Sequence, residues 1–341
     1  MRLCHISKNY KRMTSAGAIA RRDIETILEN LGSENIGLRR SFIHNGILHG
    51  LRQFIGFAKA RMSVKEGDII VLQYPMTEAF SVIARTAHRR GAKVIGVVHD
   101  LFGARELTMK PEDECRVLNL CDVLLIHNDA MRRWLTGHGC DTKMVDYEIM
   151  DYLGGPGKMS ARPLKGSPSL YFIGNADSRV NGYLYDLAAY MPENEIYVYG
   201  PNFDSERAMA TPNLKTMGVV KDTEIMATHK GDIGISWYGE SLDGPEGRFG
   251  EYMTINNPHK VGLYMRCGTP VIVWKGAGRA KFIEENSVGL SVSSLRELPD
   301  LLKMMTPEDY YAMTANVKTI SERLASGHYL RKAIDQALTL L

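Results

Sequence analysis

Residues 256–274 read NNPHKVGLYMRCGTPVIVW, and this stretch decides the fold. A helical pattern from Lys260 to Cys267 is ended by Gly268, and the apolar run TPVIVW (269–274) follows at once. Such a short, β-rich run is typical of a strand buried on both faces of a parallel sheet. A helix that leads directly into a buried strand is the repeating unit of an α/β fold.

The same alternation extends over the whole chain. A Gly- and Pro-rich stretch at 153–168 has the composition of a linker. Before it, the patterns predict strands at 2–7, 68–74, 92–100, 122–128 and, more weakly, 144–149. They predict helices at 15–31, about 46–62, 77–90 and 129–136. After the linker they predict strands at 169–175, 195–200, 214–220, 231–239, 269–274 and 290–294, and helices at 181–191, 260–267, 306–325 and 329–341.

A chain of 341 residues is too long for one ordinary core and fits two domains of roughly 150 residues each. We therefore predict an α/β protein with two Rossmann-like, doubly wound domains that face a cleft, followed by C-terminal helices. The expected parts are a first domain (1–152), a linker (153–168), a second domain (169–325) and a last helix (326–341) able to pack back on the first domain. Ligands of such sheets bind beyond the carboxyl ends of the strands.

The composition is that of a soluble globular protein, with 44% hydrophobic and 24% charged residues. The five cysteines are scattered and show no metal-binding spacing, which predicts reduced thiols. No signal peptide and no apolar run of about 18–20 residues is visible, so we expect a cytoplasmic protein, with peripheral attachment to the inner membrane face as an alternative.

The net charge of +3 conceals an asymmetry. Residues 1–65 contain 12 Lys and Arg but 4 Asp and Glu, so the remainder of the chain carries a net charge of −5. A local basic field indicates anionic partners such as phosphates or lipid headgroups. Nucleic acid is disfavoured, because no aromatic-studded basic sheet accompanies the charge.

The beginning of the 260–267 helix is unusual. Asn256 and Asn257 are good helix caps and Pro258 fits a first turn, but His259 and Lys260 bring potential cations to a helix end that prefers anions. A solvated first turn with an extended Lys side chain is the simple interpretation. An anion bound at the helix end, such as a diphosphate, would explain both cations.

Other polar residues follow predicted strands of the first domain. They are Thr14, Ser15 and Gly17 after the first strand, Glu78 after QYP (73–75), and His99 and Asp100 after 92–98. A carboxylate at such a position is a candidate general base. The simple interpretations are an ordinary capped loop at 14–17, termination of the strand at QYP, and helix capping by Asp100. GxGxxG is absent, which disfavours a dinucleotide site, and no Asp-x-Asp pair follows a strand, which disfavours a dedicated Mg²⁺ site.

In the second domain, Gly174 and Asn175 form a turn after a strand, and Arg179 begins the next helix, an arrangement suited to an anion. The polar, Gly-rich segment before Asn257 is about 20 residues long, which favours a mobile binding loop.

These motifs together resemble bacterial GT-B glycosyltransferases, and more narrowly the β-1,6-galactofuranosyltransferases and the streptococcal adhesin glucosyltransferases. The likeness rests on TSAG with R.D (14–23), QYP (73–75), HD (99–100), GN (174–175) and NNPHK with its spacing to GTPVI (256–272). It implies a UDP-sugar donor bound mainly by the second domain and a saccharide or lipid-linked oligosaccharide acceptor bound by the first.

The resemblance also assigns roles to individual residues. Lys260 and Arg179 would hold the diphosphate beside Asn257 and His259, while the turn Tyr199-Gly200 and the 174–179 loop would line the nucleotide. Thr14, Ser15 and Gly17 would close over the donor. Many retaining GT-B enzymes have a Glu five residues before the Gly of their G-x-P-V turn, and here Leu263 occupies that position.

We therefore expect an inverting, metal-independent enzyme that transfers galactofuranose or glucose from a UDP-sugar in the synthesis of bacterial surface glycoconjugates. We expect no cofactor. Asp100 is the first candidate for the catalytic base, followed by Glu78 and His99. Competing interpretations are a retaining transferase or epimerase and a nucleotide-sugar-binding regulator without turnover.

Segment 39–61, RRSFIHNGILHGLRQFIGFAKAR, combines many large apolar residues with cations and has no acidic residue. Much of it reads as an amphipathic basic helix. Its apolar side chains could pack on the first domain's sheet, form the interface of a homo-oligomer, which we expect, or contact an anionic membrane surface.

Overall fold

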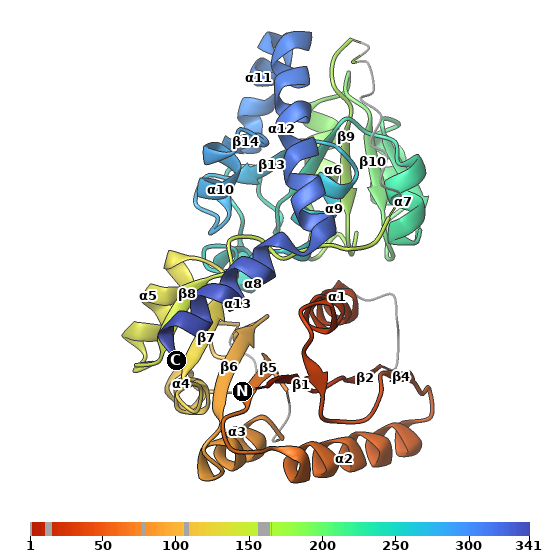
Figure 1. Ribbon diagram of the computed structural model, residues 1–341. Coiled ribbons are helices and arrows are strands. Elements are labelled where there is room, and N and C mark those ends of the chain that lie inside the picture. Colours follow the sequence, from red (N-terminus) through yellow and green to blue (C-terminus); the bar gives the residue numbers. More distant parts are fainter. Residues whose placement is uncertain (1, 11–15, 77–78, 106–108, 156–163, 165) are drawn as a thin grey trace. The chain divides into compact units, whose positions relative to one another are not determined.

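The structure is a computed structural model that describes residues 2–10, 16–76, 79–105, 109–155, 164 and 166–341. The candidate residues Thr14, Ser15 and Glu78 lie outside this part of the chain. The chain forms two compact units (Figure 1), which are Met1–Asp151 with Gly327–Leu341 (unit 1) and Tyr152–Ser326 (unit 2).

Unit 1 contains a parallel sheet in the order β3-β1-β5-β6-β7-β8. Its strands are β1 (Leu3–His5), β3 (Glu34–Asn35), β5 (Ile69–Tyr74), β6 (Lys93–Val98), β7 (Val123–Ile126) and β8 (Lys143–Asp146). A separate two-stranded ribbon pairs β2 (Asn9–Tyr10) with β4 (Ser41–Phe42). The direction of winding reverses between β1 and β5, which is where doubly wound sheets bind ligands.

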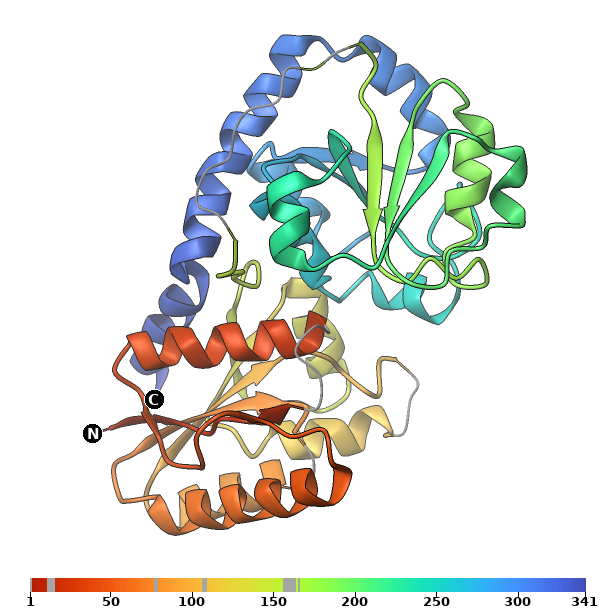
Figure 2. The same cartoon turned by 90° about the vertical axis from the view of Figure 1, so that its right-hand side faces the viewer.

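Helices cover both faces of this sheet. The helices are α1 (Ala16–Asn30), α2 (Gly46–Ser63), α3 (Ala79–Arg89), α4 (Pro111–Leu118), α5 (Asp129–Gly137) and α13 (His328–Leu340). Helices α2 and α3 lie on one face, and α1 and α13 lie on the other (Figure 2). Although α13 follows unit 2 in the sequence, it packs on β7 and β8 of unit 1.

Unit 2 contains a second parallel sheet in the order β11-β10-β9-β12-β13-β14. Its strands are β9 (Leu170–Ile173), β10 (Ile196–Tyr199), β11 (Leu214–Gly218), β12 (Ile233–Ser236), β13 (Val271–Trp274) and β14 (Gly289–Val292). Its helices are α6 (Tyr183–Tyr190), η1 (Arg207–Ala210), α7 (Asp222–Thr228), α8 (Gly247–Tyr252), α9 (His259–Arg266), α10 (Ala280–Glu285), η2 (Leu295–Glu297), α11 (Leu298–Met304) and α12 (Pro307–Ser326). Winding reverses between β9 and β12, as in a dinucleotide-type Rossmann sheet.

Helices α4, α7, α8, α10 and α11 lie outside the helix ranges predicted from the sequence. Helix α4 begins with Pro111 and carries acidic residues in its first turn, which is an ordinary helix start. Helix α8 contains Gly247 and Gly250, which hide its helical pattern. The expectation of one long irregular loop before Asn257 is therefore wrong, because α8 lies within it.

Candidate functional site

The two central strands of unit 2 separate at their carboxyl ends. Strands β9 and β12 pair only through Leu170 with Ile233 and Tyr171 with Gly234. Beyond these pairs the hydroxyl of Tyr264, on α9, donates to the carbonyl of Ile235 (2.8 Å) and accepts from the N–H of Ile173 (2.9 Å). The Tyr264 hydroxyl thus satisfies two strand groups that would otherwise lack partners, and it fixes α9 against the point where the sheet divides.

Gly234 makes this arrangement sterically feasible. A Cβ atom at Gly234 would lie 2.5 Å from the ring of Tyr264, closer than any real contact. The absence of a side chain on β12 is therefore what lets α9 approach the sheet so closely.

Lys260 lies one helical turn before Tyr264, and its ammonium is held by aromatic rings. Its Nζ is 4.5 Å from the ring centroid of Phe172 on β9 and 4.2 Å from that of Tyr238, which follows β12. No hydrogen bond or ion pair joins the Lys260 ammonium to any residue in the described ranges, and burial lowers the pKa of Lys260 to about 7. An enclosed cation of this kind, without a carboxylate partner, is suited to receive an anionic ligand.

The first turn of α9 differs from the expectation. Pro258 is the N-cap and makes no side-chain cap, so the prediction that Asn caps this helix is wrong. Asn257 is instead 3% exposed, and its Nδ2 has no hydrogen-bond partner among the described residues. The His259 ring stacks on Tyr152 with centroids 4.5 Å apart, which fixes the helix start. Pro258 offers no side-chain acceptor to the backbone N–H groups of the first turn of α9, and the N–H of Val261 donates to the carbonyl of Pro258 (3.0 Å).

The glycines after β9 and β10 bring two backbone segments into close contact. Gly174 has φ 149° and Gly200 has φ 155°. A Cβ at Gly200 would lie 1.7 Å from the carbonyl oxygen of Gly174, so only glycine fits there. No side chain therefore projects from Gly174 or Gly200 at the carboxyl ends of β9 and β10.

The other candidates of unit 2 lie around this edge but not together. The Tyr199 side chain is buried, and its hydroxyl accepts from the N–H of Lys230 (2.6 Å), so it points into the unit rather than toward a ligand. Asn175 is exposed and accepts from Asn202 (2.8 Å). Arg179 is 86% exposed and forms a bidentate pair with Asp177 (2.9 and 2.6 Å). The Arg179 guanidinium is thus paired with Asp177 in this structure.

In unit 1 the candidates gather near the reversal between β1 and β5. His99 Nε2 donates to Oε1 of Gln73 (2.8 Å), and Nε2 of Gln73 donates to the carbonyl of Arg21 (3.2 Å). Since this arrangement keeps a proton on Nε2 of His99, that nitrogen is not a free base. Arg21 in turn donates to the carbonyl of Pro75 (2.8 Å), and burial lowers its pKa.

Asp100 is a partly exposed carboxylate. It follows β6, its side chain is 38% exposed, and its Oδ1 lies 3.4 Å from Nη1 of Arg105. Lys8 follows β1 and is partly buried beside Arg21. Burial, followed by the charge of Arg21, lowers the pKa of Lys8 to about 8. Gly17 lies in the first turns of α1, with open space where a Cβ would be.

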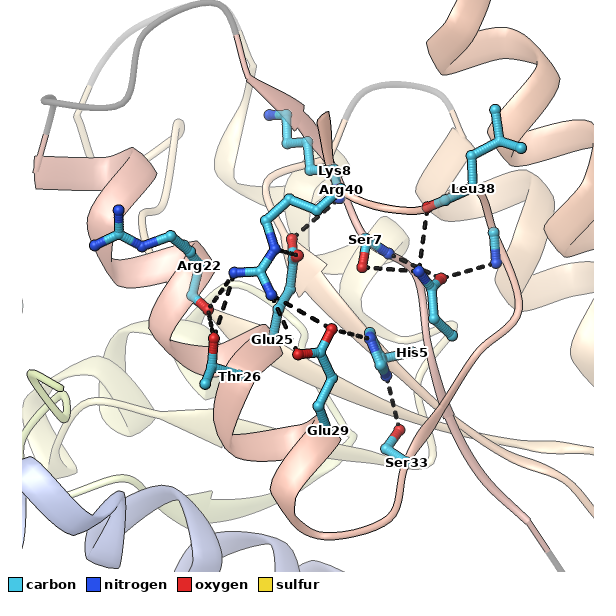
Figure 3. Close-up of polar contacts among 12 residues, drawn as sticks. His5, Ser7, Lys8, Arg22, Glu25, Thr26, Glu29, Ser33, Leu38 and Arg40 are labelled. Atoms are coloured by element: carbon cyan, nitrogen blue, oxygen red, sulfur yellow. Dashed lines mark hydrogen bonds and ion pairs between the residues drawn. The ribbon is translucent and has the colours of Figure 1, made fainter. Parts of the chain in front are cut away.

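A buried carboxylate anchors the segment after β1 (Figure 3). Glu25 of α1 is fully buried, accepts from the N–H of Lys8 (3.0 Å) and lies 3.3 Å from Nε of Arg40. It also accepts from the hydroxyl of Tyr10 (2.8 Å). Arg40 also pairs with Glu29 (3.2 Å). These contacts fix the segment after β1 to α1 and leave Arg40 occupied within unit 1.

Several residues at these sites were not predicted from the sequence. Phe172 and Tyr238 enclose Lys260, and Tyr264 places α9. Arg21 and Gln73, which connect β5 to α1, belong to the R.D and QYP motifs, but the sequence assigns them no individual role. Tyr264 stands four residues after Lys260 and so shares its helical face, which is a signal that the sequence contains. Cation–π contacts between distant residues have no sequence pattern.

Comparison with known proteins identifies the family. A model described as glucosyltransferase 3-like, N-terminal domain, matches residues 3–149, and one described as glucosyltransferase 3-like, C-terminal domain, matches 170–337. The β-1,6-galactofuranosyltransferase WbbI of Escherichia coli (strain K12) is 25% identical over 333 residues, covering 97% of this chain and 96% of its own length. Glucosyltransferase 3 of Streptococcus gordonii is 25% identical over 335 residues, covering 95% and 94%.

Solved structures show the same fold. WaaG, a glycosyltransferase involved in lipopolysaccharide biosynthesis, aligns with a TM-score of 0.57 at 12% identity and covers 98% of both chains. AviGT4, a glycosyltransferase involved in avilamycin A biosynthesis, aligns with a TM-score of 0.59 at 13% identity, covering 98% of this chain and 96% of its own. The predicted GT-B fold, with two Rossmann-like units, is confirmed. Since the two domain models together match most of its length, the chain belongs to the glucosyltransferase 3-like family of glycosyltransferases.

Proposed function

We propose that the protein is an inverting glycosyltransferase that moves a sugar from a UDP-sugar to a saccharide acceptor. The observation that carries the proposal is Lys260, an enclosed cation at the divided edge of a Rossmann sheet and at the start of α9. A helix start beside such a cation is the place where a doubly wound sheet binds a diphosphate. The nucleotide diphosphate would lie there in unit 2.

The reaction requires a leaving group to be stabilised and a nucleophile to be activated. Lys260 and the N–H groups of the first turn of α9 would stabilise the negative charge on the departing UDP without a metal ion. In unit 1, Asp100 would take the proton from the acceptor hydroxyl as it attacks the anomeric carbon from the face opposite the diphosphate. Displacement in one step inverts the configuration of that carbon.

The names of the relatives point to the sugar and the setting. One relative is a galactofuranosyltransferase and another a glucosyltransferase, so we propose galactofuranose or glucose as the sugar. The acceptor would be a saccharide or a lipid-linked oligosaccharide used in bacterial glycoconjugate synthesis, and the enzyme would work in the cytoplasm.

The test combines product analysis with one substitution. The protein is incubated with UDP-glucose or UDP-galactofuranose and acceptor sugars in the presence of EDTA, and both released UDP and the anomeric configuration of the product are measured. We expect UDP release and a product of inverted configuration. An α product from an α donor, or dependence on added Mg²⁺ or Mn²⁺, would contradict the proposed mechanism, and donor binding without turnover would indicate a regulator.

Lys260→Met tests the role of the charge. Methionine keeps the packing against the two aromatic rings but removes the cation, so we expect turnover to fall about 10²–10³-fold, the effect of losing one preorganised contact to a developing charge. Lys318→Met, on the exposed surface of α12, is the matched control and should leave turnover unchanged. Full activity of Lys260→Met would exclude Lys260 from the diphosphate site.

A further inference from the structure

Helix α2 presents its large apolar side chains to solvent. Only Gly56 and Ala60 of this helix are buried. The exposed residues, here named the α2 stripe, are Ile47 (83% exposed), Leu48 (55%), Leu51 (55%), Phe54 (71%), Ile55 (47%) and Met62 (71%). An ordinary surface helix has the reverse arrangement, with its large apolar residues inward and its small or polar residues outward. The sequence-based alternative that this stripe packs on the unit 1 sheet is therefore wrong.

The stripe is continuous along the helix. Ile47, Leu51, Phe54, Ile55 and Met62 recur at spacings of three, four or seven residues, which place side chains on one helical face. The helix lies along the outer side of unit 1, opposite α1 (Figure 2). A contiguous exposed apolar face of this kind marks an interaction surface.

Cations accompany the stripe without any acidic residue. Arg39, Lys59 and Arg61 are exposed, and Arg52 donates to the carbonyl of Arg39 (3.1 Å), which keeps it at the same edge. No Asp or Glu occurs from residue 35 to residue 65. Arg40 is not part of this group, because it pairs with Glu25 and Glu29 inside unit 1 (Figure 3).

We propose that the α2 stripe and its flanking cations attach unit 1 to the surface of an anionic lipid membrane, with α2 lying in the plane of the interface. Such a surface supplies what this face lacks, since acyl chains take up the apolar side chains and anionic headgroups lie beside the cations. No helix in the described ranges is long and apolar enough to cross a membrane, and the attachment is peripheral.

A second copy of the chain fits the same face less well. A two-fold contact through α2 would place Arg39, Lys59 and Arg61 of one copy close to the same cations of the other, with no carboxylate on this segment to pair with them. Charge complementarity therefore favours the lipid surface. This inference is independent of the proposed catalytic function.

The experiment is co-sedimentation of the full chain with vesicles, comparing phosphatidylglycerol mixed with phosphatidylcholine against phosphatidylcholine alone. We expect binding to the anionic vesicles that weakens as salt is raised, and little binding to the neutral ones. Arg39→Glu with Lys59→Glu and Arg61→Glu should weaken binding at least about 100-fold, since each cation contributes roughly fivefold. Ile47→Gln with Leu51→Gln and Phe54→Gln should abolish it at unchanged charge.

Matched controls come from unit 2. Lys281→Glu with Lys303→Glu and Lys318→Glu makes the same change of charge at other exposed positions and should retain binding. Met209→Gln with Val219→Gln and Met304→Gln, at residues 76%, 77% and 77% exposed, removes comparable apolar surface and should also retain it. Circular dichroism verifies that each variant is folded.

Sedimentation velocity tests whether a second copy of the chain, rather than a membrane, covers the α2 stripe. If the wild-type chain does not bind to anionic vesicles at low salt, the proposal is overturned. It is also overturned if the α2 stripe variant dissociates an oligomer while binding to vesicles persists, because α2 would then be an interface between copies.

Discussion

At the scale of single residues, the lowered pKa of Lys260 predicts how donor binding depends on pH. Burial brings this pKa to about 7, so without a donor Lys260 is mostly neutral at pH 8 and mostly charged at pH 6. A bound diphosphate favours the ammonium and raises the pKa, so binding above pH 7 takes up a proton. The affinity for UDP-glucose should therefore be nearly constant below about pH 7 and weaken by up to about tenfold per pH unit above it.

Calorimetry in buffers of different ionisation enthalpy measures this proton uptake directly. We expect uptake at pH 8, little at pH 6, and none at either pH in Lys260→Met. Equal affinity of the wild type at both pH values would mean that Lys260 does not contact the diphosphate.

Asp100 is the second residue whose role is testable alone. Its half-exposed carboxylate follows β6, so Asp100→Asn should preserve the fold and UDP affinity and lower turnover about 10²–10⁴-fold. Asp141→Asn, at an exposed position whose side chain makes no hydrogen bond or ion pair among the described residues, is the control and should be neutral. If Asp100→Asn turns over normally, Asp100 is no base and Glu78→Gln is the next variant to measure.

At the scale of elements, the position of α9 depends on one hydroxyl. Tyr264→Phe leaves the partly buried N–H of Ile173 and the buried carbonyl of Ile235 without this partner, which should lower the free energy of unfolding of unit 2 by about 1–3 kcal/mol. Urea denaturation measures the change. Tyr311→Phe on α12, where the ring is 40% exposed and the hydroxyl makes no contact with described residues, should have no effect. A fully stable Tyr264→Phe would show that α9 is held by packing alone.

The sequence predicts elements better than it predicts the site, for a physical reason. Strands such as 68–74 are continuous apolar runs, and a helix stopped by Gly268 is a local pattern, so both are visible in one window of sequence. The enclosure of Lys260 is not local. It depends on rings from β9 and from the segment after β12, and these meet only because the sheet reverses its winding there.

At the scale of the whole molecule, the chain passes from unit 1 to unit 2 and returns. Asp151 accepts from the N–H groups of Tyr329 (3.2 Å) and Leu330 (2.7 Å), so the last residues of the first passage cap the helix that closes unit 1. Leu330 itself is fully buried. The stability of unit 1 therefore depends on residues that are synthesised after the whole of unit 2.

Leu330→Ala tests this dependence. We expect it to cost unit 1 about 2–5 kcal/mol, as is usual for a buried Leu replaced by Ala. Amide hydrogen exchange should then accelerate in β7 and β8, about 200 residues earlier in the sequence, because α13 packs on both strands, while exchange in 170–326 stays unchanged. Leu302→Ala, at a buried position of α11, is the reciprocal control and should accelerate exchange in unit 2 alone. Uniform acceleration across both units in either variant would mean that they unfold as one cooperative body, and the division of the chain at Asp151 and Gly327 would then carry no energetic meaning.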